Sequence, residues 1–355
     1  MRVLIAVDSF KGSLSAAEAG AAIAAGWRSA RPADPVDVLP LADGGEGTAD
    51  VVAAATPGAV RQVVPAVTGP DGRSTPAEWF ALPGGVAVLD LARTSGLPLM
   101  AAPDAMGATT RGLGEAIRDA LAHGAVEVWI GLGGSASTDG GLGALRALGL
   151  RARDGAGRDI PEGGAGLARL ATVELDGIAP IPGGVTLLTD VTSPLLGEHG
   201  AAAVFAPQKG ATSAQVRLLE RGLARLAEVL GADPSTPGSG AAGGTAYGFA
   251  AVYQAAIVSG ADRVAELSRL DDRIAAADLV ITGEGAFDDQ SSRGKLVGNV
   301  LGRARAAGKA AAVVAGVVRA DPGVAHASLV EAAGDAAASL REPARWAAAA
   351  AASLA

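Results

Sequence analysis

Short apolar segments that end in polar, glycine-rich loops recur along this chain, and this pairing constrains its fold more than any other feature. The first example is Val3–Val7, which runs into Asp8-Ser9-Phe10-Lys11-Gly12. Similar loops begin near residues 42, 131, 189 and 282. In parallel α/β sheets such loops lie at the carboxyl edge of the strands, where helix N-termini and backbone N–H groups attract anions. The five loops therefore predict an α/β protein with one polar binding cleft.

One segment departs from this pattern, because its apolar strands are joined by tight turns and not by polar loops and helices. Residues 63–91 predict strands joined by turns at Gly69-Pro70-Asp71-Gly72 and Pro83-Gly84-Gly85, which indicates hairpins and antiparallel pairing. Residues 237–248 form a glycine-rich stretch expected to connect helices. The expected helices are residues 15–28, 49–55, 109–123, 213–230 and a terminal helix over 346–355, and the other expected strands are 3–7, 36–41, 126–130, 186–188, 279–281 and 310–318.

The fold predicted from these elements has two α/β domains. A Rossmann or flavodoxin-like parallel-sheet domain is expected from residues 1–60 plus 255–355, because both ends of the chain carry the strand-and-polar-loop pattern. A mixed-sheet α/β domain, residues 61–254, is expected as an insertion, with the active site in the cleft between the two domains. No repeat of fixed period or low-complexity linker argues for separate tandem domains.

Composition excludes several classes of function. The net charge of −8 and the lack of a basic run exclude a nucleic-acid partner on electrostatic grounds. The chain has no cysteine, so thiolate metal sites and disulfides are excluded and any metal needs oxygen ligands. The apolar stretch at the N-terminus is too short for a signal peptide or a membrane span, so we expect a cytoplasmic protein without a membrane partner, possible as a homodimer.

The loop that starts at Gly131 matches the G-x-G-x-x-A pattern of a dinucleotide site, but it lies mid-chain and carries several hydroxyl groups. A phosphate cradle fits this composition better, because glycine lets the backbone approach phosphate oxygens and hydroxyls add donors. No Walker A loop is present, since Gly294-Lys295 is followed by Leu296. An NAD-dependent oxidoreductase of a small hydroxy-acid and a non-catalytic sugar-acid binding protein stay open as alternatives.

Acid and lysine side chains in the loops suit phosphoryl transfer. The chain has only three histidines and no G-x-S-x-G elbow, so nucleophilic hydrolysis has little support. Phosphoryl transfer relies mainly on positioning and on neutralisation of charge, and a carboxylate can accept the proton of a hydroxyl acceptor.

Six motifs together carry a family resemblance. In chain order they read VDSFKGSLSA, PLADGGEGT, GLGGSASTDGG, FAPQKGA, GAAGGTAYG and VITGEGAFDDQSSRGK. The series resembles that of the class I bacterial glycerate kinase family over essentially the whole chain. The resemblance implies ATP and Mg²⁺ as cofactors, glycerate as substrate and 2-phosphoglycerate as product.

The site residues are predicted from this resemblance together with their positions in the polar loops that follow the strands. The predicted catalytic residues are Lys11, Asp190, Glu284 and Asp288, with Asp190 and Asp288 as the metal ligands. The predicted glycerate-binding residues are Asp8, Ser9, Asp43, Gly44, Glu46 and Lys295. The predicted nucleotide- and phosphate-binding residues are Gly133, Gly134, Ser135, Ser137, Asp139, Lys209 and Gly283. Two loops depart from the family pattern: Ser137-Thr138 replaces Thr-Asn, and Thr192-Ser193 replaces Asp-Asn, which leaves Asp190 as the single acid of its loop.

Overall fold

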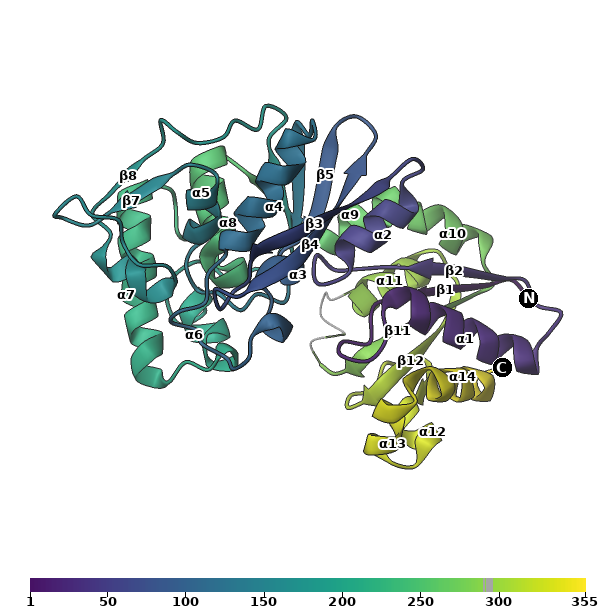
Figure 1. Ribbon diagram of the computed structural model, residues 1–355. Coiled ribbons are helices and arrows are strands. Elements are labelled where there is room, and N and C mark those ends of the chain that lie inside the picture. Colours follow the sequence, from purple (N-terminus) through teal and green to yellow (C-terminus); the bar gives the residue numbers. More distant parts are fainter. Residues whose placement is uncertain (290, 292–295) are drawn as a thin grey trace. The chain divides into compact units, whose positions relative to one another are not determined.

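The computed structural model describes residues 1–289, 291 and 296–355 (Figure 1). The chain forms two compact units, residues 1–43 with 261–355 and residues 44–260. Residues 44–60 and 255–260 group with the second unit in this division, whereas the sequence prediction placed them in the first domain. Each unit has its own sheet and its own core.

The first unit is built on a five-stranded sheet in the order β13-β12-β11-β1-β2, and every neighbouring pair is parallel. The strands are β1 (Val3–Val7), β2 (Val36–Pro40), β11 (Leu279–Phe287), β12 (Ala310–Val318) and β13 (Ala325–Ser328). Strands from the start and the end of the chain therefore lie side by side, which confirms the α/β class with a parallel sheet. Because all five strands run in one direction, the loops that follow them meet at one edge.

Helices cover both faces of this sheet (Figure 1). One face packs on α1 (Ala16–Ala30) and α14 (Pro343–Ser353), and the other on α11 (Leu296–Ala306). Helix α1 begins at Ser15, which forms a capping box with Glu18. A Cβ atom at Gly26 would lie 1.9 Å from the carbonyl oxygen of Ala348, so only glycine lets α1 and α14 approach this closely. The remaining helices are α9 (Gly260–Leu267), α10 (Leu270–Ala276), α12 (Leu329–Ala333) and α13 (Ala336–Arg341).

The second unit has a six-stranded mixed sheet in the order β10-β9-β6-β5-β4-β3. Strands β3, β4 and β5 pair antiparallel, which confirms the predicted hairpins, and the other pairs are parallel. The strands are β3 (Val60–Thr68), β4 (Ser74–Leu82), β5 (Val86–Asp90), β6 (Glu127–Gly131), β9 (Val185–Leu188) and β10 (Ala256–Val258), with a separate hairpin of β7 (Arg151–Arg153) and β8 (Thr172–Glu174).

Helices α4 (Arg111–Ala122) and α7 (Ser213–Leu230) contribute buried side chains to the core of the second unit. Thr212 and Gln215 form a capping box at the start of α7, and Gly231 ends it in the left-handed conformation. The other helical segments are α2 (Thr48–Ala55), α3 (Ala92–Ser95), η1 (Leu97–Leu99), α5 (Leu142–Ala147), η2 (Gly164–Arg169), α6 (Ala201–Phe205), η3 (Pro207–Lys209) and α8 (Ala241–Tyr253).

The glycine-rich stretch at 237–248 is only partly the connector that the sequence predicts. Residues 242–244 have left-handed backbone angles, and the regular turns of α8 follow them. Thr245, Ala246 and Tyr247 are buried against the core, so packing overrides the low helix propensity of the neighbouring glycines.

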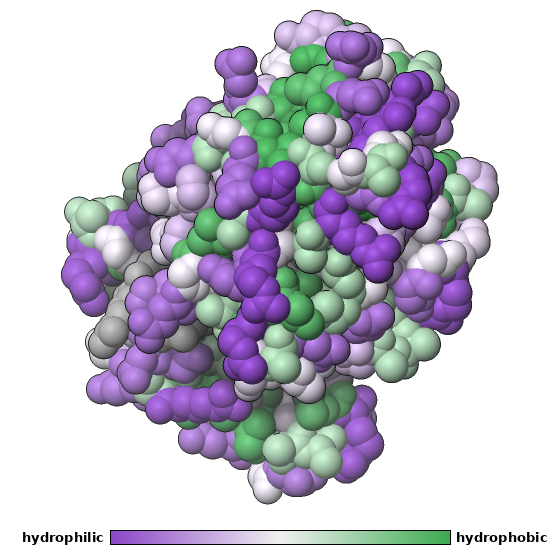
Figure 2. All heavy atoms as spheres, turned by 90° about the vertical axis from the view of Figure 1, so that its left-hand side faces the viewer, coloured by the Kyte–Doolittle hydropathy of each residue, from purple (hydrophilic) through white to green (hydrophobic). Residues whose placement is uncertain are grey.

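None of the helices in the described part of the chain is long and apolar enough to cross a membrane. On the face shown in Figure 2, hydrophilic and hydrophobic side chains alternate over short distances.

Candidate active site

Three carboxylates meet at the carboxyl edge of the first-unit sheet. Asp8 follows β1 directly, Asp43 comes shortly after β2, and Glu284 lies near the end of β11. The strands hold these positions together, because the Asp8 N–H donates to the carbonyl oxygen of Gly283 at 3.1 Å. All three acids line a pocket of about 550 Å³ formed by residues of the first unit. The structure thus brings together Asp8, Ser9, Lys11, Asp43, Glu284 and Asp288 of the predicted set.

Lys11 supplies positive charge to this pocket. Its Nζ lies 3.7 Å from Oδ2 of Asp43, and 70% of its side chain is exposed. The charge of Asp43, with smaller contributions from Asp8 and Glu284, raises the pKa of Lys11, although burial acts in the opposite direction. Lys11 is therefore a charged ammonium group that an anionic ligand can reach.

Asp8 is the most buried of the three acids, with 6% of its surface exposed. Burial, followed by the negative charge of Asp43, raises its pKa to about 7, although Lys11 and a hydrogen bond from the Ser9 N–H at 2.6 Å act in the opposite direction. A carboxyl group with such a pKa can accept or donate a proton near neutral pH.

Glycines let the loop after β1 lie close to the neighbouring strands. A Cβ atom at Gly285 would be 3.3 Å from the amide nitrogen of Lys11, and one at Gly316 would be 2.3 Å from the carbonyl oxygen of Gly285. Gly283, predicted to bind phosphate, pairs with Val314 inside the sheet. A Cβ atom at Gly283 would lie 1.9 Å from the carbonyl oxygen of Val314. Its observed role is close packing of β11 on β12, and phosphate contact stays a prediction.

Asp288 follows β11 and is tied to the next turn. Its N–H donates to Oγ of Ser291 at 3.0 Å, and the Ser291 N–H donates to Oδ1 of Asp288 at 3.2 Å. Lys295, the remaining predicted glycerate-binding residue of this segment, lies outside the described residues.

In the second unit, the loop of Gly44 and Glu46 is held against the loop of Gly133. The Gly133 N–H donates to the carbonyl oxygen of Gly44 at 3.0 Å. A Cβ atom at Gly133 would lie 2.4 Å from Cα of Gly45, so the contact requires glycine. Glu46 is exposed beside this contact. The predicted glycerate loop and phosphate loop are thus packed backbone to backbone within this unit.

Asp90, which the sequence analysis missed, holds the end of the loop that contains Gly44 and Glu46. Its carboxylate accepts hydrogen bonds from the N–H groups of Gly47 and Ala49, both at 2.9 Å, at the start of α2. Burial raises its pKa to about 7, although Arg93 and the two N–H donors act in the opposite direction. The signal was available, because Asp90 ends an apolar run at Val86–Leu89 as Asp8 does after Val3–Val7.

The predicted phosphate loop is rich in internal hydrogen bonds. The Ser137 N–H donates to Oγ of Ser135 at 3.1 Å, and Gly134 has a φ of 76° that favours glycine. Lys209 is buried and its ammonium group donates to the carbonyl oxygen of Ser137. Burial lowers the pKa of Lys209 to about 8, although the charge of Asp139 acts in the opposite direction.

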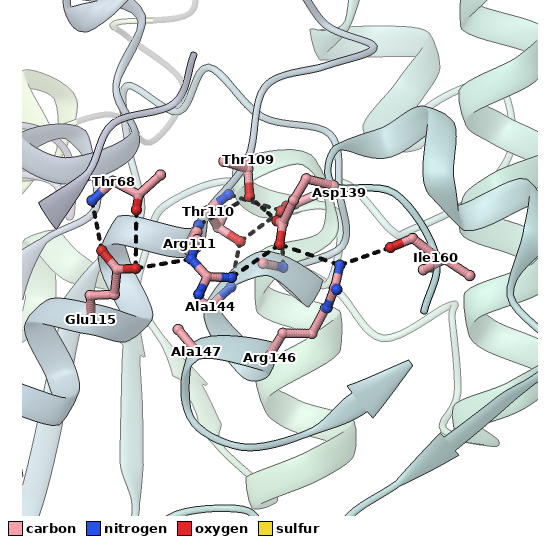
Figure 3. Close-up of polar contacts among 12 residues, drawn as sticks. Thr68, Thr109, Thr110, Arg111, Glu115, Asp139, Ala144, Arg146, Ala147 and Ile160 are labelled. Carbon is pink, nitrogen blue, oxygen red and sulfur yellow. Dashed lines mark hydrogen bonds and ion pairs between the residues drawn. The ribbon is translucent and has the colours of Figure 1, made fainter. Parts of the chain in front are cut away.

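Asp139 lies in the polar network of Figure 3. Its Oδ2 accepts hydrogen bonds from the N–H and the hydroxyl of Thr110 at 2.9 and 2.8 Å and from the Gly143 N–H at 3.2 Å. Its Oδ1 accepts from the Gly141 N–H at 3.1 Å. Burial raises its pKa, against the effect of these donors. The carboxylate therefore fixes the loop to the starts of α4 and α5, and a direct nucleotide contact stays a prediction.

Asp190 comes two residues after the end of β9, as the sequence indicates, and is half-buried. The hydroxyl of Ser259 donates to its Oδ1 at 2.9 Å. Asp190 belongs to the second unit and Asp288 to the first. No cluster of three or more Asp, Glu or His side chains suited to hold a metal ion occurs in the described ranges 1–289, 291 and 296–355.

Comparison with known proteins decides the family. The model of the "Glycerate kinase family" matches residues 3–355. The chain belongs to the glycerate kinase family. This confirms the resemblance inferred from the six motifs.

Relatives in this family are similar over most of their length. "Glycerate 2-kinase" of Escherichia coli K12 is 40% identical over 336 residues, which cover 92% of this chain and 88% of the relative. "Glycerate kinase" of Bacillus subtilis 168 is 42% identical over 83% of this chain and 79% of its own length. The crystal structure of a "putative glycerate kinase 2" from Salmonella typhimurium LT2 superposes with a TM-score of 0.78 at 38% identity, covering 98% of this chain and 97% of that one.

Proposed function

We propose that this member of the glycerate kinase family transfers the γ-phosphoryl group of ATP to the 2-hydroxyl of glycerate and releases 2-phosphoglycerate and ADP. The observation that carries the proposal is the family match over residues 3–355, which includes every motif of the series. The pocket of Asp8, Lys11 and Glu284 supports it, because it offers a cation for an anionic ligand next to groups that can accept a proton. Nothing in the structure favours the oxidoreductase or the non-catalytic binding protein.

In the proposed reaction the substrate hydroxyl oxygen attacks the γ-phosphorus, the bond from that phosphorus to the β,γ-bridging oxygen breaks, and ADP leaves. The hydroxyl proton passes to a carboxylate, for which Asp190 is our first candidate, with Glu284 and Asp288 as further candidates. Lys11 stabilises the anionic charge of the transferring group or of the glycerate carboxylate. Such chemistry depends mainly on positioning and charge neutralisation.

Mg²⁺ fits the donor set by chemistry. It is commonly held by one or two carboxylates together with substrate phosphates and water. Asp190 and Asp288 are oxygen donors of this kind, and a site completed by phosphates does not require a cluster of three acids. Bound with ATP, the ion would neutralise phosphate charge.

The other predicted contacts are part of the proposal. We assign Asp8, Ser9, Asp43, Gly44, Glu46 and Lys295 to glycerate binding. We assign Gly133, Gly134, Ser135, Ser137, Asp139, Lys209 and Gly283 to the nucleotide, either by direct contact or by holding its loop. A cytoplasmic location and a homodimer are further proposals.

The test is an ADP-release assay with MgATP, with and without glycerate, followed by phosphorus NMR of the product. We expect ADP only when glycerate is present, and a product phosphorylated at the 2-position. Turnover coupled to NAD, or glycerate binding without ADP release, would contradict the proposal. A 3-phosphoglycerate product would show that the protein is a glycerate kinase that phosphorylates the 3-hydroxyl in place of the 2-hydroxyl.

A further inference from the structure

Arg319 occupies a position in the first unit equivalent to those of the predicted site residues. It directly follows β12, as Asp8 follows β1 and Asp288 follows β11. Phe287 and Val318 are partners in the parallel pair of β11 and β12, and the Arg319 N–H donates to the carbonyl oxygen of Phe287 at 2.8 Å. The Arg319 side chain therefore starts at the carboxyl edge of the sheet, and it lines the same pocket as Asp8 and Lys11.

The loop after β1 brings Lys11 towards β12. The Lys11 amide packs on Gly285 of β11, and Gly285 packs on Gly316. Gly316 lies near the end of β12, shortly before Arg319. Phe10, just before Lys11, is buried with 1% of its surface exposed, so this loop is anchored to the unit. Two cationic side chains are thus presented to one pocket from fixed backbone positions.

The acidic lining of this pocket favours a second cation beside Lys11 for an anionic substrate. Four carboxylates line it, from Asp8, Asp43, Glu284 and Asp288. Lys11 already faces Asp43 at 3.7 Å. Arg319 is exposed, and within residues 1–289, 291 and 296–355 its side chain forms no ion pair. A small carboxylate that enters beside four acids is repelled unless a cation without a bound partner meets it.

We propose that Arg319 binds the carboxylate of glycerate and makes the pocket select an α-hydroxy acid over its uncharged analogues. This inference rests on the proposed function and names the residue that recognises the substrate. The guanidinium group is planar and presents a fork of N–H donors that matches a carboxylate, whereas the Lys11 ammonium is a point charge. Lys11 is then free to act on the transferring phosphoryl group.

The experiment compares wild type, Arg319→Met, Arg319→Lys and the matched control Arg305→Met, which removes an exposed arginine of α11 outside the pocket. For each protein we would measure kcat and KM for glycerate, KM for MgATP, and the inhibition constant of glyceramide, in which a neutral amide replaces the carboxylate. The thermal midpoint of each variant shows whether it is folded.

We expect Arg319→Met to raise KM for glycerate by about 10- to 100-fold, the loss expected when one charge-assisted pair is removed. In Arg319→Met, KM for MgATP and the inhibition constant of glyceramide should change less than about twofold. The KM for glycerate of Arg319→Lys should lie between those of wild type and Arg319→Met. Arg305→Met should match wild type in every constant. An unchanged KM for glycerate would overturn the proposal. A parallel rise in KM for MgATP, which indicates phosphate binding, or in the glyceramide constant would also overturn it. If wild type and Arg305→Met both fail to phosphorylate glycerate, the proposed function itself fails.

Discussion

The ammonium group of Lys209 donates a hydrogen bond to the main-chain carbonyl oxygen of Ser137 inside the second unit. Lys209 is 2% exposed, and the charge of Asp139 acts to raise its pKa while burial lowers it. The lysine is thus a structural partner of the loop that we assign to the nucleotide.

Replacing Lys209 by Met tests this relationship. The variant keeps most of the length of the side chain but removes the charged donor of the Ser137 carbonyl, which then accepts only from the Ser135 hydroxyl at 3.4 Å, and this should cost about 1 to 3 kcal/mol of stability. We expect a lower thermal midpoint and a higher KM for MgATP, because the loop loses its fixed position. The control is Arg217→Met, which removes an exposed charge from α7. A Lys209 variant that behaves like this control would show that the buried hydrogen bond has no effect.

The buried carboxylate of Asp90 should make stability depend on pH. Its folded pKa of about 7 is above the ordinary value of 3.8 for an aspartic acid, so the folded state holds its proton more tightly than the unfolded state. Its contribution to stability is then full below about pH 4 and is lost as pH rises to about 7, with a slope of up to roughly 1.4 kcal/mol per pH unit.

Asp90→Asn removes this titration. We expect the variant to be less stable than wild type at every pH, because Gly47 and Ala49 donate to different oxygens of Asp90 and the amide puts an NH2 group, which is a donor, opposite one of these N–H groups. The gap in thermal midpoint should be largest at pH 4 and should narrow towards pH 8. A gap that stays constant between these values would contradict the raised pKa.

Gly133→Ala should damage the packing of two loops at once. The added Cβ atom would meet Cα of Gly45 at 2.4 Å, and backbone atoms cannot move aside as a flexible side chain can. We expect kcat/KM to fall by at least tenfold for both glycerate and MgATP, together with a lower thermal midpoint. Gly302→Ala is the matched control, because an added Cβ atom there meets nothing within 4 Å and alanine favours the helix by about 0.5 to 1 kcal/mol. Equal activity of the two variants would be evidence against the contact.

Asp190→Asn tests the proposed proton acceptor. The substitution keeps size and hydrogen bonding and removes the charge, so we expect kcat to fall by about 10² to 10⁴. The Mg²⁺ requirement should rise as well if Asp190 holds the metal ion. Ser259→Ala keeps the carboxylate but removes the hydroxyl at 2.9 Å, and should change kcat only a few-fold. Near-normal kcat in Asp190→Asn would direct attention to Glu284 and Asp288.

The sequence predicts the strands and helices well where a periodic apolar pattern is bounded by clear signals. Val3–Val7, Ala310–Val318 and the capped helix Ser213–Leu230 have the bounds that the sequence indicates. The strand expected at 279–281 continues to Phe287, because Gly283 and Gly285 pair closely with β12 where the sequence suggests a loop. Local signals do not reveal such a non-local contact.

The site residues were predicted from motif resemblance and strand-end position, which identify residue types at the sheet edge. These two signals do not show which acids accept structural hydrogen bonds within the protein. Asp139 belongs to a motif, yet its carboxylate accepts four hydrogen bonds from Thr110, Gly141 and Gly143. Asp90 and Arg319 belong to no quoted motif, although each comes at the end of an apolar run, and the pairing of their strands places each at the edge of its sheet.

The pairing of β1 with β11 has a consequence for biosynthesis. Val3 lies opposite Leu279, so β1 gains this neighbour only after the residues between them have been translated. At roughly 5 to 20 residues per second, the strand waits on the order of tens of seconds. During that time an apolar segment has an open edge of the kind that chaperones protect from aggregation. The second unit, whose strands are contiguous in sequence, can complete its core first.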